Sequence, residues 1–232
     1  MMEYLEGVKK AKTLEIGELL VQAEGTEVKV NGAVHTIRDM GNVAFVILRK
    51  RDGLVQCVFE EGVTAFDLKE LKEASAVEVL GTIRKEERAA HGIEIRLKEI
   101  KVLSEPDEPL PLPISKWKLN TSLEAKLNMR PISLRNVRER AKFKIQEGLV
   151  RGLRDFLYEQ GFTEIHTPKL GAKSAEGGAN LFKLEYFHRP AILQQSPQLY
   201  KQMMVGVFDR VFETAPVFRA EKHNTKRHLN EY

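Results

Sequence analysis

The sequence contains a single cysteine, Cys57, among 232 residues. One thiol can form neither a disulfide within the chain nor a metal site built from several cysteines, which excludes disulfide-stabilised scaffolds and cysteine-based zinc sites. Long apolar runs are also missing. No uninterrupted stretch approaches the roughly 20 residues of a membrane span, and residues 1–12 lack the apolar centre of a signal peptide. We therefore expect no membrane segment and a cytoplasmic location.

An excess of one charge sign is nearly absent too, because 37 Lys and Arg against 33 Asp and Glu leave a net charge of +4. Basic clusters at residues 49–51 and 135–144 would suit a polyanionic partner, although a solvated basic face gives the same pattern. The 6 histidines show no metal-ligand spacing, so we expect no metal site among these residues. The 42% of hydrophobic residues suffice for one or two ordinary cores.

Short alternating segments separated by turn residues fill the chain from Leu14 to Leu103. This rhythm predicts a small antiparallel barrel with a short helix at Phe66–Ala74, which is the layout of a five-stranded OB-fold, although other small barrels fit the count as well. The expected strands are Glu27–Val30, Val43–Leu48, Leu54–Phe59, Ala76–Leu80, and Ile93–Leu97 continued by Ile100–Leu103.

Four prolines within Ser104–Pro113 predict a linker, because proline continues neither a helix nor a central strand. Beyond it, apolar periodicity predicts a long amphipathic helix at Arg135–Gln160 that ends at Gly161. We expect an α+β protein with a barrel domain at 1–103, a hinge at 104–130 and a second domain at 131–232. The remaining expected elements are an extended segment at Phe162–Pro168, a helix from Pro197 through Val207 and a strand at Val211–Arg219.

Polar residues with a distinctive spacing gather near the end of the chain: Gln195–Gln202, Phe218–Glu221 and Arg227–Tyr232. An arginine fixed on a strand can fork onto a carboxylate and a phosphate at once, and so bring two anions together. Arg219 is our candidate for a catalytic role of that kind. A strand arginine taken alone is more often a surface ion-pair partner.

The spacing from Phe218 to Tyr232 resembles motif 2 of class II aminoacyl-tRNA synthetases, and together with Gln195–Gln202 it resembles the aspartyl-tRNA synthetases. The resemblance implies an antiparallel-sheet catalytic domain. It also implies that Arg219 and its neighbours bind ATP and that the aspartate site includes Arg219 and a lysine that asparaginyl enzymes lack. The ATP-binding set would be Arg219, Glu221, Arg227, His228, Leu229 and Tyr232, and the aspartate-binding set Glu176, Gln198, Lys201 and Arg219.

Glu176 lies in Ser174–Asn180, which resembles the loop that closes over the amino acid, although a plain Gly-Gly turn would look the same. The barrel segment from Asn31 to Gln56 is similar to the anticodon-binding domain of aspartyl-, asparaginyl- and lysyl-tRNA synthetases. By that resemblance the anticodon-binding residues are His35, Arg38, Phe45, Gln56 and Glu94, with Phe45 stacked on the central uridine. Read without it, Phe45 would be barrel core and Arg38 a surface charge. Ala33 departs from the family, which usually has tryptophan there.

The resemblance further implies ATP with Mg²⁺ as cofactors, tRNA(Asp) and L-aspartate as partners, and a homodimer formed through motif 1, which the long helix and Gly161–Pro168 would supply. The spacing between Lys201 and Arg219 and the Phe-Arg-Ala-Glu-Lys-His-Asn-Thr run favour the subgroup that also charges tRNA(Asn). Motif 3 and the acidic Mg²⁺ ligands are not in this sequence, so we expect an N-terminal portion that cannot form adenylate alone. Three other interpretations stay open: an asparaginyl enzyme, a tRNA-binding fragment or paralogue, and a synthetase-like asparagine-forming enzyme, which the barrel disfavours.

Overall fold

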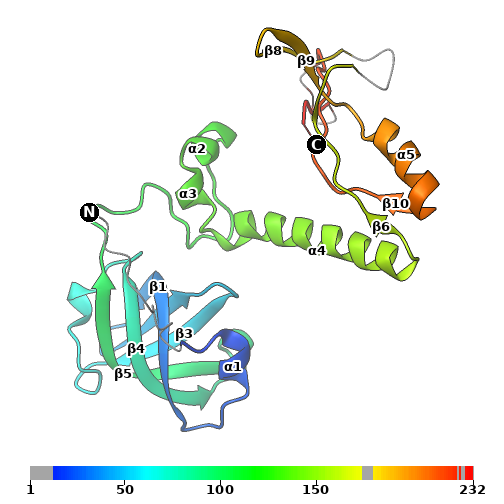
Figure 1. The fold of residues 1–232 in the computed structure, drawn as a ribbon. Coiled ribbons are helices and arrows are strands. Elements are labelled where there is room, and N and C mark those ends of the chain that lie inside the picture. Colours follow the sequence, from blue (N-terminus) through cyan, green and yellow to red (C-terminus); the bar gives the residue numbers. More distant parts are fainter. Residues whose placement is uncertain (1–12, 174–179, 224, 226–227, 232) are drawn as a thin grey trace, which may run out of the picture. The chain divides into compact units, whose positions relative to one another are not determined.

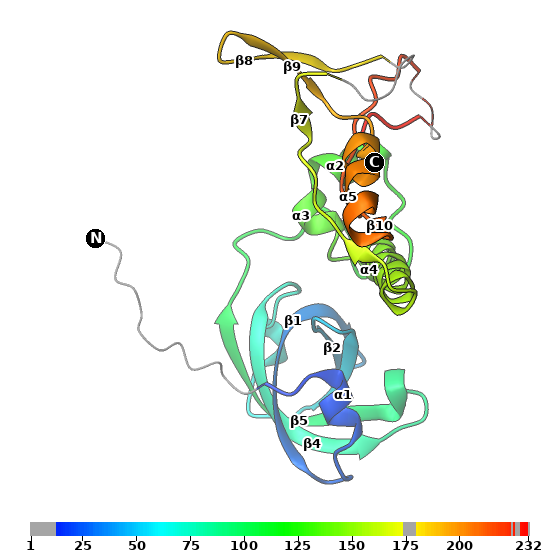
Figure 2. The same ribbon diagram turned by 45° about the vertical axis from the view of Figure 1, so that its right-hand side comes forward.

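The computed structural model describes residues 13–173, 180–223, 225 and 228–231. The chain divides into two compact units, Met1–Lys142 and Phe143–Tyr232, which are described in turn. The boundary between them falls inside a helix, so the expected three-part division at 103 and 130 stays a prediction. Figures 1 and 2 show the course of the chain.

Within the described residues of the first unit, five strands close into a barrel in the order β1-β2-β3-β5-β4 (Figure 1). Its neighbouring strands pair antiparallel, except that β3 and β5 run parallel. The expected OB-fold barrel is thereby confirmed, with strands that extend beyond the predicted bounds. The elements are α1 (Ile16–Leu20), β1 (Glu27–Asp39), β2 (Val43–Arg49), β3 (Leu54–Glu60), β4 (Ala76–Lys85) and β5 (Ile93–Ser104).

Alternate residues of each strand face the barrel interior, as the two-residue period of a strand requires. Val46, Cys57 and Ile95 are fully buried there, on three neighbouring strands. Burial raises the pKa of the Cys57 thiol, so this side chain is a neutral packing group. The reading of Cys57 as ordinary core packing is consistent with this environment.

Gly81 marks the closest approach of two strands in the barrel. A Cβ atom added there would lie 2.3 Å from the carbonyl oxygen of Arg96, a backbone atom that cannot turn away. We expect Gly81→Ala to lower the free energy of unfolding by about 1–3 kcal/mol, as overpacking does. Urea denaturation measures the change, and Gly17→Ala is the matched control, because a Cβ on Gly17 in helix α1 meets nothing within 4 Å. Equal stability of the two variants would contradict the expectation.

The helix expected at Phe66–Ala74 is wrong. The segment contains only a 3₁₀ turn, η1 (Leu68–Glu70), and a second turn, η2 (Ala90–Gly92), precedes β5. The side chain of Asp67 accepts a hydrogen bond from the backbone N–H of Lys69 at 3.0 Å, which stabilises a turn. Leu71 then adopts extended backbone angles and is buried against the barrel core. Burying this one leucine prevails over the helical periodicity.

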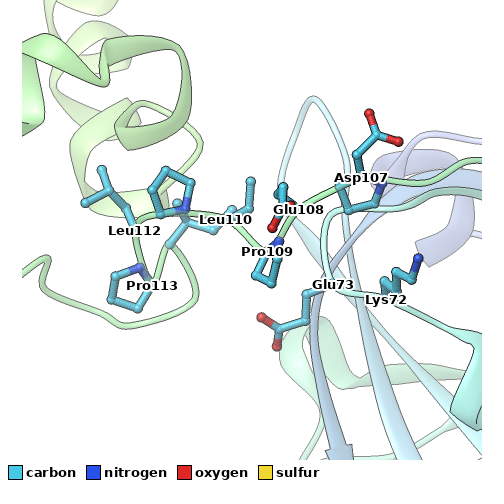
Figure 3. Close-up of a pocket in the computed structure, with 11 residues that line it drawn as sticks. Lys72, Glu73, Asp107, Glu108, Pro109, Leu110, Leu112 and Pro113 are labelled. Carbon is cyan, nitrogen blue, oxygen red and sulfur yellow. The ribbon is translucent and has the colours of Figure 1, made fainter.

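The proline-rich linker is ordered and packs onto its own unit. Leu112 and Ile114 are buried, and residues 106–114 enclose a largely apolar cavity of about 690 Å³ together with Lys72 and Glu73 (Figure 3). Two short helices follow, α2 (Leu123–Asn128) and α3 (Arg130–Ser133).

Asn136 joins the linker to the long helix α4 (Val137–Glu159). Its side-chain Nδ2 donates hydrogen bonds to the carbonyl oxygens of Ile114, at 2.8 Å, and of Lys116, at 2.6 Å. Its Oδ1 accepts from the backbone N–H groups of Arg138 and Glu139, both at 3.1 Å, which caps the helix. A single buried amide thus sets where the helix starts, two residues later than predicted.

The second unit contains most of α4 and two small sheets. β6 (Thr163–Glu164) pairs parallel with β10 (Val211–Phe212), and β7 (Leu170–Gly171), β9 (Arg189–Leu193) and β8 (Lys183–Tyr186) form an antiparallel sheet. The expected strand Val211–Arg219 is wrong beyond Phe212. Pro216 lacks an N–H for a ladder, and Phe218 forms only an isolated bridge with Glu231. The helix expected from Pro197 is α5 (Gln198–Phe208).

Helix α4 has no buried residue among those described, although its apolar positions follow the helical period. Ile145, Leu149, Leu153 and Phe156 stand on one stripe and remain exposed. Among the described residues, no neighbour buries these four apolar side chains. In the part of the chain that is described, no helix combines the length and apolarity needed to cross a membrane.

Candidate nucleic-acid interface and nucleotide site

The residues predicted to bind the anticodon share the outer face of the barrel. Arg38 on β1 is the cross-strand partner of Phe45 on β2, and Gln56 on β3 is the partner of Glu94 on β5. Their neighbours Ala44, Val46, Val55 and Cys57 face the core, so the four side chains alternate outward. The structure thus brings together four predicted site residues that span 57 positions of the sequence.

A β-bulge delivers the fifth residue, His35. Val34 pairs with Leu48 and Thr36 with Ile47, so His35 is the extra residue between two consecutive pairs. A bulge re-aims a side chain, and His35 is buried next to the equally buried Val34. Burial lowers the pKa of His35. The positive charges of Arg49 and Arg140 lower it further, whereas the negative charge of Glu73 raises it. The imidazole is therefore neutral at pH 7 and can both donate and accept hydrogen bonds.

A cavity of about 260 Å³ opens on this face. It is smaller than the pockets that hold drug-sized ligands, which suits a single planar base. Three predicted residues line it, His35, Arg38 and Gln56, and Phe45 lies one row away on the same face. The complete lining is His35, Thr36, Arg38, Ile47, Leu54, Gln56, Arg88, Ala90 and Ser115.

Glu94 lies beneath Gln56. Its carboxylate accepts a hydrogen bond from Gln56 Nε2 at 3.1 Å and forms an ion pair with Arg84 at 3.6 Å. The side chain of Glu94 is only 5% exposed. With Nε2 engaged, the amide oxygen of Gln56 remains to accept a hydrogen bond from a base edge. Glu94 therefore orients Gln56 in this structure, and its direct contact with a base stays a prediction.

In the second unit, four consecutive backbone N–H groups fix the segment that carries Arg219. Phe218 N donates to Gln194 O at 3.0 Å, and Ala220 N donates to Asn180 O at 3.1 Å. Arg219 N donates to Asn230 O at 2.9 Å, and Glu221 N to Asn230 Oδ1 at 3.1 Å. Residues 218–221 are thereby hydrogen-bonded to three separate segments, which fixes the backbone at Arg219.

Two of those segments are the ones the sequence singled out. Gln194 leads directly into the expected aspartate-binding residues, Gln198 and Lys201, which both lie in the first turn of α5. Gln195 is buried, and its Nε2 donates to Asn180 O at 3.0 Å, the same carbonyl that accepts from Ala220. One hydrogen-bonded junction therefore joins the segment that precedes α5 to the segment of Arg219.

The segment predicted to be the returning strand of motif 2 is described from His228 to Glu231, and it forms no strand there beyond the isolated bridge between Glu231 and Phe218. The exposed His228 contacts Thr225, with 2.6 Å between Nδ1 and Oγ1, and the exposed Leu229 follows it. Three predicted site residues, Glu176, Arg227 and Tyr232, lie outside the described residues.

A buried charge network that the sequence did not indicate supports this region. The Glu213 carboxylate accepts hydrogen bonds from the N–H and the hydroxyl of Thr167, both at 2.8 Å, and from Lys169 Nζ at 2.7 Å. Burial alone would raise the pKa of Glu213, but these donors outweigh it and hold the pKa below its ordinary value. The network fixes the segment that contains Pro168 against the segment leading to Arg219.

Two family matches cover most of the chain. Residues 122–232 match the tRNA synthetases class II (D, K and N), and residues 28–103 match the OB-fold nucleic acid binding domain. Residues 122–232 therefore belong to the class II tRNA synthetase family, and residues 28–103 to the OB-fold nucleic-acid binding family.

Within that class, the chain is similar to proteins named Aspartate–tRNA(Asp/Asn) ligase. It is 48% identical to that of Deinococcus radiodurans over 213 residues, which are 92% of this chain and 48% of the relative. It is 47% identical to that of Thermus thermophilus over 208 residues, 90% of this chain and 48% of the relative. The chain thus spans about half the length of the curated relatives it matches.

Two solved structures resemble the fold. Asparaginyl-tRNA synthetase from Pyrococcus horikoshii complexed with asparaginyl-adenylate gives a TM-score of 0.83 at 32% identity, over 95% of this chain and 51% of that one. A putative aspartyl-tRNA synthetase from Leishmania major Friedlin gives 0.80 at 33%, over 100% of this chain and 48% of that one. These two structures are of proteins named for different amino acids, asparagine and aspartate.

Proposed function

We propose that the protein is an aspartate–tRNA ligase, which activates L-aspartate with ATP and transfers it to tRNA. The observation that carries the proposal is the junction at Asn180 and Gln194, which ties the segment of Arg219 to the segment that leads to Lys201. A guanidinium suited to an anionic transition state and an ammonium suited to a side-chain carboxylate are thereby held on connected segments.

In the proposed first step, a carboxylate oxygen of aspartate attacks the α-phosphorus of ATP. The new bond is the acyl–phosphate bond of aspartyl-adenylate, and the bond that breaks releases pyrophosphate. Charge develops on the α-phosphate oxygens, and Arg219 would stabilise it while holding the attacking carboxylate. Glu221, His228 and Leu229 would line the nucleotide site, as would Arg227 and Tyr232. Glu176 and Gln198 would hold the aspartate.

ATP and Mg²⁺ are the proposed cofactors. Among the described residues, no three His, Cys, Asp or Glu side chains gather as metal ligands would. We therefore assign no Mg²⁺ ligand in this part of the chain, and the ion would arrive bound to the phosphates of ATP.

A tRNA is the proposed macromolecular partner, recognised by the outer face of the barrel, and a cytoplasmic location follows from that partner. The exposed stripe of α4 supports the proposal of a homodimer through motif 1, because an apolar stripe needs a partner. A monomer in sedimentation equilibrium of the full-length protein would rule the dimer out.

We expect Phe45→Ala to weaken tRNA binding about 5- to 150-fold. The expectation follows because a base stacked on an aromatic ring is worth about 1–3 kcal/mol. Filter binding with tRNA transcripts measures the change, and aspartyl-adenylate formation without tRNA should stay at the wild-type rate. Phe187→Ala is the matched control, since Phe187 is an exposed aromatic residue of the second unit, 81% exposed. Equal binding by the two variants would refute the stacking role of Phe45.

The finer proposal is that the enzyme charges both tRNA(Asp) and tRNA(Asn). His35 supports it, because a neutral imidazole in the base cavity can donate or accept and so tolerate two different bases. Aminoacylation of the two separate transcripts by the full-length protein tests it. If only tRNA(Asp) is charged, the dual specificity fails and the aspartate ligase stands.

Asparagine activation is the second candidate, favoured by the likeness to a structure holding asparaginyl-adenylate. Lys201 opposes it, because a neutral amide would leave the ammonium group without its counter-charge. Pyrophosphate exchange with each amino acid decides between the two.

A further inference from the structure

Arg49, the last residue of β2, has a guanidinium that the fold leaves partly unsatisfied. Its Nη1 is buried and has no hydrogen-bond partner in the part of the chain that the structure describes. Burial, together with the positive charges of Arg135 and Arg140, lowers the pKa of Arg49 to about 10. The Arg49 guanidinium therefore stays charged at neutral pH. It lies close enough to Arg135 and Arg140 for the positive charges to repel one another.

The two other arginines come from the start of the helical segment. Arg140 Nη1 donates to the carbonyl oxygen of Lys50 at 3.1 Å, which places this guanidinium beside the end of β2. Arg135, in the turn before α4, is exposed. Within the first unit, Arg135 is therefore open to solvent and Arg140 is half-buried, and both lie close enough for their charges to act on Arg49.

Little negative charge offsets the cluster. Among the described residues, Glu73 is the carboxylate that acts on neighbouring His35, and it accepts a hydrogen bond from the N–H of Ile37 at 3.4 Å. Glu139 is close in sequence but binds Lys126 and Lys142. A cation cluster with a buried, unpartnered donor is unfavourable unless an anion completes it.

The cluster adjoins the base cavity. Arg49 is the cross-strand partner of Leu54 and lies two residues after Ile47, and both Leu54 and Ile47 line the cavity. His35, a third lining residue, also has a buried nitrogen, Nδ1, without a partner among the described residues. A pocket for a base and a place for an anion are therefore contiguous, in the arrangement of a nucleotide.

We propose that Arg49, Arg135 and Arg140 form a phosphodiester-binding subsite for single-stranded RNA at the edge of this cavity. The proposal rests on the proposed tRNA-binding function and assigns three residues to it beyond the base readers. Guanidinium groups bind phosphate oxygens in a forked geometry, and such contacts fix the register of the strand without selecting its sequence. The subsite would hold the backbone while His35, Arg38 and Gln56 meet the base.

The decisive variant is Arg135→Gln, because this exposed side chain can change without disturbing the barrel. We expect it to weaken binding of an anticodon hairpin about tenfold. The loss should be the same for a hairpin with an altered anticodon, and the salt dependence of log K should become shallower by about 0.7–1. Lys29→Gln is the charge-matched control on the barrel, since Lys29 pairs with Glu78 at 2.7 Å and faces solvent.

A loss confined to one anticodon sequence, or a salt dependence no shallower than that of Lys29→Gln, would overturn the subsite. A second readout needs no RNA. Sodium sulfate should raise the melting temperature of the wild-type protein more than that of Arg135→Gln, when both are compared with chloride at equal ionic strength. Equal shifts contradict the proposal. If the wild-type protein does not bind the hairpin but its stabilisation by sulfate still depends on Arg135, the proposed tRNA binding is refuted and the anion site is retained.

Discussion

Replacing Arg219 with alanine in the full-length protein is expected to reduce aspartyl-adenylate formation about 10³-fold. The loss is large because the guanidinium would act mainly in the transition state, where charge builds on the α-phosphate. Pyrophosphate exchange measures the rate. Binding of tRNA by the barrel should not change, because Arg219 belongs to the other unit.

Arg219→Lys separates charge from geometry. Lysine keeps the positive charge but offers a point donor in place of a fork, so we expect it to recover little of the lost rate. Arg189→Ala is the matched control, because Arg189 is an exposed strand arginine in the same unit. Activity within a few-fold of wild type in Arg219→Ala would show that another residue neutralises the two anions.

Hydrogen bonds to the backbone explain why such a variant should stay folded. Phe218, Arg219 and Ala220 donate their N–H groups to three different segments, and a side-chain substitution at residue 219 leaves those donors in place. A changed melting temperature would therefore signal contacts of the guanidinium itself. The catalytic and structural contributions of Arg219 can thus be measured separately.

The barrel could be predicted from the sequence because its strands alternate and its turns hold glycine or asparagine at short intervals. The bulge at His35 could not, since a bulge is a mismatch between two strands and a single strand does not reveal it. The resemblance assigned His35 to the site, whereas the structure supplies the reason that its side chain reaches the cavity.

The other omissions share a cause. Arg88 and Ser115 line the base cavity from the β4–β5 connection and from the linker, and neither has a local pattern that indicates a site. Arg49 and Arg135 lie near each other because the fold places the end of β2 beside the start of α4, where Arg140 donates a hydrogen bond to the carbonyl oxygen of Lys50. The basic clusters at 49–51 and 135–144 were visible as composition, but their convergence depends on tertiary structure. Residues brought together across 86 positions are beyond periodicity arguments.

Replacing Lys201 with methionine is expected to lower the catalytic efficiency for aspartate about 10²- to 10³-fold, with a much smaller effect on asparagine. Removing one partner of a buried charge pair costs about 2–5 kcal/mol, chiefly because the remaining carboxylate loses its counter-charge. Methionine keeps much of the length of lysine and removes the charge, so the change isolates the electrostatic contribution.

The position of Lys201 strengthens this expectation. It lies in the first turn of α5, whose N-terminus begins at Gln198, and the N-terminal end of a helix favours anions. The lysine and the helix end would act on the same carboxylate. Both interactions would therefore contribute to the difference in binding free energy between aspartate and asparagine. Lys183→Met, at an exposed position of β8, controls for the loss of a positive charge.

The aspartate-to-asparagine ratio of efficiencies in pyrophosphate exchange is the quantity to measure, because it cancels any general loss of activity. In Lys201→Met the ratio should fall, whereas in Lys183→Met it should match the wild type. A constant ratio in both variants would mean that selection of the charged side chain resides elsewhere in the full-length protein, and the asparagine candidate would then have to be weighed without Lys201.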